Sequence, residues 1–262
     1  MIRRSILGVV LATTVLFGAG CVSIQAVRPE DPLLPPPEWV DVGFGAARRE
    51  ATVGSRAAKG SLILYRFPAK GFSWRFEHST SSLSVREWAA RFPEAAFLTN
   101  GVYFHEDNMP SGLLITKGER VGDRVFDDTK SGIIQLAPEF RIIDSSKEKI
   151  TSYASFTEAA QSYPFLIQDG EGAVAEDTGK FAERTFIGTD RSGDIYVGVL
   201  LNEPVSLFEL MELIAAQPVE WKNVINLDGG ASTGYAAAFP NENEGRNSLT
   251  PVPNVIVVTP KP

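Results

Sequence analysis

The residues best suited to chemistry lie close together in the stretch NVINLDGGASTGY, which spans residues 223–235. An acid follows a largely apolar run and precedes two glycines and two hydroxyl side chains, namely Asp228, Gly229, Gly230, Ser232 and Thr233. Glycines in a tight turn let backbone N–H groups approach an anion, and hydroxyls add further donors. A carboxylate beside such a turn suits hydrolysis of a phosphorylated sugar, although the same residues are also typical of a turn that merely hydrogen-bonds itself.

A second interpretation of this stretch is a serine hydrolase. Residues 230–234 match the pattern G-x-S-x-G of a nucleophile elbow, with Ser232 as the nucleophile. The elbow takes its histidine from a position after the serine, whereas the two histidines of this chain are His78 and His105. The serine hydrolase is therefore the weaker interpretation.

The motifs of several cofactor-dependent classes are missing. Two histidines and the single cysteine, Cys21, cannot form a zinc cluster, and neither a complete dinucleotide fingerprint nor a P-loop occurs. Carboxylate-rich loops could hold calcium, but the sequence has no D-x-[DN]-x-[DN]-G run. We therefore expect no cofactor and assign no metal ligand.

The beginning of the chain predicts export and a lipid anchor. Arg3 and Arg4 precede an apolar run from Ile6 to Phe17 that is too short to cross a bilayer, which is typical of a secretory signal. The residues GAG before Cys21 resemble a bacterial lipobox, in which the cysteine is lipidated; plain secretion is the alternative. With a formal net charge of −7, no nucleic-acid partner is expected. Val22 after the cysteine favours an outer-membrane lipoprotein that faces the periplasm.

Three elements of domain organisation are expected. Residues 1–20 form the signal peptide, residues 21–60 carry the lipidated end and a proline-rich tether, and residues 61–262 form the folded domain. Strand-like runs outnumber helical ones, and RTFIGTDRSGDIYVGVLL, residues 184–201, indicates a hairpin. The pattern predicts a single α+β domain with a mixed, largely antiparallel sheet flanked by a few helices.

Helix starts are predicted by the capping signature S-x-x-E, which occurs at Ser84–Glu87, Ser155–Glu158 and Ser206–Glu209. In the third of these segments, apolar residues recur on one helical face, as expected for core packing. They are Leu207, Leu210, Met211 and Ile214.

Several stretches together resemble the phosphodiester glycosidase family, which includes the animal uncovering enzyme. LTNGVYF resembles the family's Asn-Gly-Gly-Tyr/Phe-Phe block, PSGLLITKGE its Pro-x-Gly-Leu strand, RTFIGTDRSGDIYVGVL its Arg-Thr strand pair, NLDGGAST its Asn-Leu-Asp-Gly-Gly-Gly-Ser block, and PVPNVIVV its closing strand. The blocks occur in family order from about residue 95 to residue 258. Two positions depart from the family, since Val102 and Ala231 stand where it usually has glycine.

The resemblance implies an enzyme that cleaves the bond between a sugar carbon and a phosphodiester oxygen. The departing phosphate monoester is a good leaving group, so such a site mostly needs donors for phosphate and one carboxylate for the sugar. The implied catalytic residues are Asp228 as nucleophile or general base, Arg184 as a two-pronged phosphate ligand, and Ser232. The implied substrate-binding residues are Asn100, Gly101, Gly229, Gly230 and Thr233.

A second carboxylate is harder to assign. Four acids lie in loops at strand ends, Asp169, Glu171, Glu106 and Asp107, but Asp-Gly is also a common hairpin turn. The leading prediction is a membrane-tethered phosphodiester glycosidase that acts on glycan or cell-envelope material outside the cytoplasm. The alternative is an envelope lipoprotein that uses the same fold to bind glycans without catalysis. If one site binds a phosphosugar, the strand ends at Asn100, Arg184 and Asp228 must converge.

Overall fold

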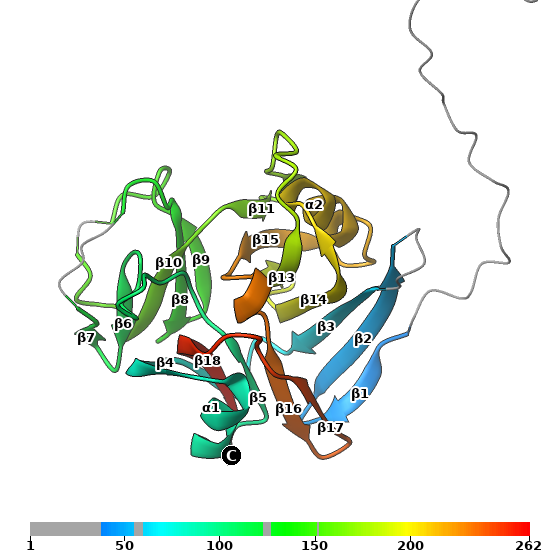
Figure 1. Ribbon diagram of the computed structural model, residues 1–262, viewed down its shortest axis with the longest axis horizontal. Helices are drawn as coiled ribbons and strands as arrows, with labels where there is room; N and C mark the ends of the chain where they lie inside the picture. The colour runs from blue at the N-terminus through cyan, green and yellow to red at the C-terminus, as the bar shows by residue number, and fades with distance from the viewer. Residues whose placement is uncertain (1–37, 55–59, 123–126, 151) are drawn as a thin grey trace, which may run out of the picture. The chain divides into compact units, whose positions relative to one another are not determined.

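Three antiparallel sheets make up the described part of the chain, residues 38–54, 60–122, 127–150 and 152–262 of a computed structural model (Figure 1). The expected signal peptide, Cys21 and most of the proline-rich tether lie outside the described residues. From Glu38 onward the described residues belong to one compact unit. All strand pairs in the described ranges are antiparallel. The fold is also richer in β-structure than the expected α+β sheet with a few helices.

The first sheet has eight strands and carries the predicted hairpin. Across the sheet their order is β1 (Val40–Gly43), β2 (Ala46–Val53), β3 (Gly60–Phe67), β14 (Ile195–Val205), β13 (Ala182–Asp190), β15 (Trp221–Asn226), β11 (Phe165–Gln168) and β12 (Glu171–Gly172). The hairpin of residues 184–201 is confirmed as β13 and β14, which pair from Ala182 with Val205 to Thr189 with Ile195.

Each of the other two sheets has five strands. The second has the order β7 (Glu119–Arg120), β6 (Leu114–Thr116), β10 (Glu158–Ser162), β8 (Gly132–Ala137) and β9 (Arg141–Asp144). The third has the order β17 (Glu242–Arg246), β16 (Tyr235–Phe239), β5 (Phe97–Asn100), β18 (Val252–Pro260) and β4 (Phe72–Leu83). A buried apolar cluster contains side chains from all three sheets, including Phe67, Phe76, Ile134 and Ile187.

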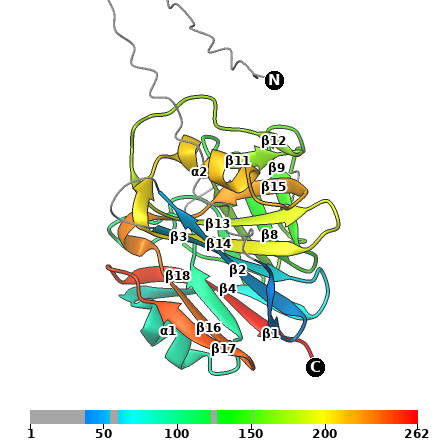
Figure 2. The same ribbon diagram turned by 90° about the vertical axis from the view of Figure 1, so that its right-hand side faces the viewer.

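Two α-helices occur in the described residues, and both begin as predicted. In α1 (Val85–Arg91) and α2 (Leu207–Ala215), the capping serine and the glutamate three residues later exchange hydrogen bonds with each other's backbone N–H groups. Helix α2 lies against the first sheet (Figure 2). Its Leu210 and Ile214 pack into a second apolar cluster with residues of that sheet. Trp88 of α1 is buried in a third cluster and donates its indole N–H to Val252 O at 2.9 Å.

The helix expected after Ser155 is wrong. Residues 158–162 form β10 between β6 and β8, and all five residues are buried. The carboxylate of Glu158 does not cap a helix; instead it accepts the backbone N–H of Phe76 and that of Lys117, each at 2.8 Å. Pairing on both edges therefore overrides the local capping signature in this segment.

The first sheet begins before residue 61, where the folded domain was expected to start. β2 pairs with β3 over seven residues, from Ala47 with Arg66 to Val53 with Gly60. Arg48 on β2 also forms an ion pair with Glu244 on β17, with 2.9 Å between Nε and Oε1. Residues 40–53 thus belong to the sheet, and the expected tether of residues 21–60 extends too far.

Candidate functional site

Asn100, the last residue of β5, connects by hydrogen bonds the three segments that the sequence predicted would converge. Its side chain is fully buried. Nδ2 donates to Asp228 O at 2.7 Å, while Oδ1 accepts from Thr185 Oγ1 at 2.8 Å and from Gly234 N at 3.2 Å. Asn100 therefore joins the end of β5 to β13 and to the loop after β15, and its amide is engaged largely with the protein itself.

Asp228 is placed by its backbone as well as by Asn100. β15 ends at Asn226, after which Leu227 N donates to Thr185 O at 2.9 Å and Asp228 N donates to Gly101 O at 3.2 Å. These bonds hold the chain between β5 and β13 immediately after the strand. These bonds fix the backbone from which the Asp228 side chain projects.

The Asp228 carboxylate is half-buried and accepts the backbone N–H of Gly229 at 2.9 Å. Burial raises the pKa of this carboxyl group, while the Ser232 side chain and the Gly229 N–H partly oppose the rise. Asp228 forms no ion pair among the described residues. A carboxylate in this environment is a stronger base than an exposed one.

Arg184 is a buried cation held by backbone carbonyls. Its side chain is 9% exposed; Nε donates to Val205 O at 3.1 Å and Nη2 donates to Lys180 O at 2.6 Å. No carboxylate pairs with it in the part of the chain that the structure describes. Burial lowers the pKa of the guanidinium, an effect that the Tyr103 phenol opposes. Nη1 is left without a protein partner in the described residues, so it remains available to an anion.

The two glycines after Asp228 serve different purposes. A methyl group at Gly229 would lie 2.9 Å from Glu183 O and 3.8 Å from Arg184 Cδ, so glycine lets the turn pass close to β13. Gly230 has a φ of +62°, a left-handed conformation that favours glycine. The turn continues as a short 3-10 helix, η1 (Gly230–Ser232).

Most donors of this turn are already used or are buried. The N–H groups of Ser232 and Thr233 bond to Gly229 O at 3.3 Å and to Gly230 O at 3.1 Å. The hydroxyl of Thr233 is buried and has no partner among the described residues. The turn therefore offers an anion fewer N–H donors than the sequence predicted. Arg184 is the main cationic group beside this turn.

Gly101 and Val102 are shaped by Asn254 on β18. Asn254 Oδ1 accepts Val102 N at 2.7 Å, and Nδ2 donates to Val102 O at 3.0 Å. A methyl group on Gly101 would lie only 2.1 Å from Asn254 Oδ1. Glycine at position 101 is therefore explained by packing against Asn254. The side chain of Val102, where the family usually has glycine, is buried.

Sequence reasoning missed Tyr103 and Asn226. Asn226 Nδ2 donates to the Tyr103 hydroxyl, and the Tyr103 ring lies 4.9 Å from the ring of Tyr163. Burial and the nearby Asp228 raise the pKa of Tyr103, whereas Arg184 and the Asn226 amide act in the opposite direction. The phenol thus bonds to a residue that lies two positions before Asp228 in the chain. The only available signal was its place, three residues after Asn100 and within a motif block.

Two candidates for a second carboxylate, Asp169 and Glu171, lie away from this group. Asp169 and Gly170 form the left-handed turn between β11 and β12, with φ values of +52° and +92°. Asp169 N donates to the Asn223 side chain, which places this turn toward the beginning of β15, whereas Asp228 follows its end. Glu171 lies beside this turn, and Glu106 and Asp107 are exposed in the loop after Tyr103. The hairpin interpretation of Asp-Gly is confirmed.

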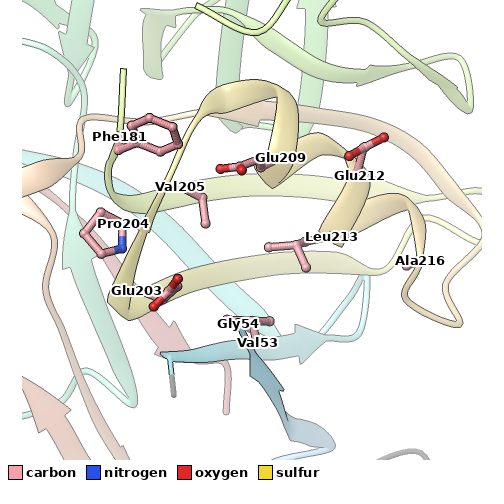
Figure 3. A pocket seen from close by; sticks show the side chains of 10 residues that line it. All are labelled: Val53, Gly54, Phe181, Glu203, Pro204, Val205, Glu209, Glu212, Leu213 and Ala216. Carbon is pink, nitrogen blue, oxygen red and sulfur yellow. The ribbon is translucent and has the colours of Figure 1, made fainter. Parts of the chain in front are cut away.

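A cavity of about 770 Å³ lies beside the carbonyl that binds Arg184 (Figure 3). None of the catalytic or substrate-binding residues predicted from the sequence lines this cavity. Phe181 and Val205 border it, and Val205 supplies the carbonyl that binds Arg184 Nε. The cavity also carries three carboxylates, those of Glu203, Glu209 and Glu212. Because these charges oppose a phosphate, we take the group around Asp228 and Arg184 as the candidate site.

The described residues contain no group of three or more His, Cys, Asp or Glu side chains arranged to hold a metal ion. Neither helix in these ranges has the length and apolar character needed to cross a membrane.

The candidate site lies within a region that matches a known family. The model of that family, described as phosphodiester glycosidase, matches residues 93–259, which is more than half of the chain. A search of curated proteins found no match.

Three solved structures share the fold at low sequence identity. The catalytic domain of zebrafish N-acetylglucosamine-1-phosphodiester α-N-acetylglucosaminidase, auto-inhibited by its pro-peptide, is 15% identical with a TM-score of 0.61, covering 87% of this chain and 85% of that chain. A hypothetical protein from Synechocystis is 15% identical with a TM-score of 0.60, covering 87% and 64%. A Burkholderia pseudomallei protein whose name suggests export is 11% identical with a TM-score of 0.51, covering 78% and 74%.

Proposed function

Because the chain belongs to the phosphodiester glycosidase family, as its sequence motifs predict, we propose that it hydrolyses the bond between C1 of a sugar and the oxygen of a phosphodiester. The products are a free sugar and a phosphate monoester. The proposed substrate is glycan or cell-envelope material outside the cytoplasm, bound by the site around Asp228 and Arg184.

Arg184 carries this proposal. Its guanidinium is buried, is anchored by two backbone carbonyls and has no carboxylate partner among the described residues. Burying an unpaired charge costs free energy, which a bound anion offsets. A phosphodiester is such an anion, and the planar guanidinium matches its oxygens. The same group stabilises the negative charge that grows on the phosphate as it leaves.

Asp228 is proposed to act at the sugar carbon. Its carboxylate either attacks C1 directly or removes a proton from the attacking water, and the electron pair of the broken C1–O bond leaves with the phosphate. The raised pKa of Asp228 makes its carboxylate a stronger base for this proton removal. We propose that Ser232, whose side chain acts on Asp228, positions this carboxylate.

The serine hydrolase interpretation has little support from the geometry. His78 Nε2 lies 3.0 Å from Asn108 O, and His105 is exposed in the loop after Tyr103. Neither histidine contacts Ser232. The nucleophile elbow therefore lacks the base that its motif requires.

Isotope labelling tests the reaction. An N-acetylglucosamine 1-phosphodiester hydrolysed in water enriched in oxygen-18 should place the label on the anomeric hydroxyl of the released sugar, because water attacks carbon. Mass spectrometry of both products measures its position. Label on the phosphate would show attack at phosphorus and contradict the proposal. Binding without turnover, across a broad panel of phosphosugars, would favour the glycan-binding alternative.

Variants of Arg184 test the phosphate ligand. Arg184→Lys keeps a positive charge but loses the planar fork, so kcat/KM should fall roughly 100-fold. Arg191→Lys is the matched control, because Arg191 is exposed in the turn at the opposite end of β13. Steady-state kinetics on the same phosphodiester measure both variants. Equal activity of Arg184→Lys and wild type would remove Arg184 from the proposed site.

A further inference from the structure

The orientation of the Asn226 amide determines what the Tyr103 hydroxyl can do. Asn226 Nδ2 donates to Leu227 O at 2.7 Å and also to the Tyr103 hydroxyl. A carbonyl oxygen can only accept, so the contact with Leu227 fixes which end of the amide carries hydrogen. The phenol oxygen of Tyr103 is therefore the acceptor in its bond with Asn226.

It follows that the phenol proton is left over. In the described ranges, no acceptor receives it, although Tyr103 is half-buried. The residue is well fixed, because its carbonyl accepts Ser111 N at 2.9 Å and its ring packs against Tyr163 at 4.9 Å. A fixed donor without an acceptor is the arrangement that stabilises charge developing on a substrate.

The hydroxyl also lies near both charged residues of the proposed site. Gly101 O, two residues before Tyr103, accepts Asp228 N at 3.2 Å. Asn226, which binds the phenol, is followed by Leu227, whose N–H donates at 2.9 Å to the carbonyl of Thr185 beside Arg184. Asp228 raises the pKa of Tyr103 and Arg184 lowers it, in agreement with this proximity. Burial is the largest cause of the raised pKa, so the phenol keeps its proton at neutral pH and remains a donor.

We propose that the Tyr103 hydroxyl donates a hydrogen bond to the departing phosphate and is a further catalytic residue of this site. The inference rests on the proposed function. As the C1–O bond breaks, its electron pair moves onto the phosphate oxygen, and C1 bonds to the incoming oxygen. Tyr103 retains its proton throughout, sharing it with the phosphate oxygen, while Asn226 holds the phenol in place.

The test compares Tyr103→Phe with wild type on two N-acetylglucosamine 1-phosphodiesters, a methyl and a 4-nitrophenyl ester. The variant keeps the ring against Tyr163 but removes the donor. We expect kcat on the methyl ester to fall roughly 100-fold. The loss on the nitrophenyl ester should be clearly smaller, because its phosphate is less basic and needs less stabilisation. A purely structural role would lower both rates by the same factor.

Two further variants complete the design. Asn226→Asp keeps the phenol but offers its proton a carboxylate, so it should reproduce the unequal losses of Tyr103→Phe. Tyr196→Phe is the control for removing a buried tyrosine hydroxyl. Tyr196 bonds to Asp190, which lies at the opposite end of β13 from Arg184. It should leave both rates unchanged.

Failure of the inference is distinguishable from failure of the proposed function. Turnover by wild type, together with unchanged rates or equal losses in Tyr103→Phe, would overturn the role of Tyr103 alone. Absence of turnover by wild type on every phosphodiester would overturn the proposed function and the role of Tyr103 with it. If Tyr103→Phe does not fold, as judged by circular dichroism, the Asn226→Asp variant decides between these outcomes.

Discussion

At the scale of single residues, the candidate site contains two charges that its own surroundings disfavour. Burial raises the pKa of Asp228 and lowers the pKa of Arg184, and neither residue has an oppositely charged partner among the described residues. Such groups lower the stability of a protein unless a ligand compensates them. Stability and activity should therefore respond in opposite directions when one of these charges is removed.

Asp228→Asn should abolish turnover and raise the melting temperature at neutral pH. A raised pKa means that the folded protein holds this proton at pH values where the unfolded chain has released it, so stability falls as pH rises through that range. The variant avoids this loss, and its advantage should vanish below about pH 4, where the unfolded carboxyl is also protonated. Calorimetry from pH 3 to pH 7 measures the difference. A variant less stable than wild type at pH 7 would contradict this account.

At the scale of elements, the three S-x-x-E segments show that a local sequence motif does not always determine the secondary structure. Two of them begin helices, and the third enters β10. In β10 the polar side chains of Glu158, Gln161 and Ser162 are buried. Glu158 and Gln161 accept hydrogen bonds from backbone N–H groups that are distant in sequence, and Ser162 donates one to a distant backbone carbonyl. Such partners lie far away in sequence, so no capping signature could reveal them.

Glu158→Gln should destabilise the protein although its size hardly changes. Both carboxylate oxygens accept backbone N–H groups, from Phe76 on β4 and from Lys117 in the turn after β6. An amide would turn its NH₂ toward one of these donors, which costs about 1–3 kcal/mol. Glu87→Gln in α1 is the matched control, because glutamine also serves in an exposed capping box. Urea unfolding measures both variants, and equal effects would refute the special role of Glu158.

For the whole molecule, the sequence predicted strands best where apolar residues alternate or run together. The hairpin of residues 184–201 is confirmed as β13 and β14, and the closing strand PVPNVIVV is confirmed as part of β18. β2 and β17 were missed, because charged residues fill them and pair across the molecule, as Arg48 does with Glu244. Strands of this composition have little periodic signal.

Residues of the candidate site could be predicted only where they belong to a short motif whose residue types indicate a reaction. Asp228 and Arg184 were predicted from their motif blocks, and the convergence of their strands is confirmed. Tyr103 and Asn226 could not be assigned, because their importance depends on which end of an amide faces which acceptor. Sequence order does not contain that information.

Attachment to a membrane remains a prediction for the part of the chain before Glu38. Cys21→Ser should abolish incorporation of labelled palmitate and release the protein into the soluble fraction, because the thiol is the proposed lipid acceptor. Metabolic labelling followed by fractionation measures both effects. A wild-type protein that takes up no label would contradict the lipoprotein assignment, and plain secretion would then be favoured.

The buried amide of Asn100 has a consequence for how the protein opens. It bonds to Asp228, Thr185 and Gly234, so the first sheet, the third sheet and the turn after Asp228 share one linkage. The first and third sheets cannot separate locally from each other without breaking it. In native-state hydrogen exchange, the amide protons of Asn100 and Gly234 should therefore exchange only at the rate of complete unfolding. Heat or denaturant should then erase the site and the fold in the same cooperative step, with no population of folded molecules that have lost the site.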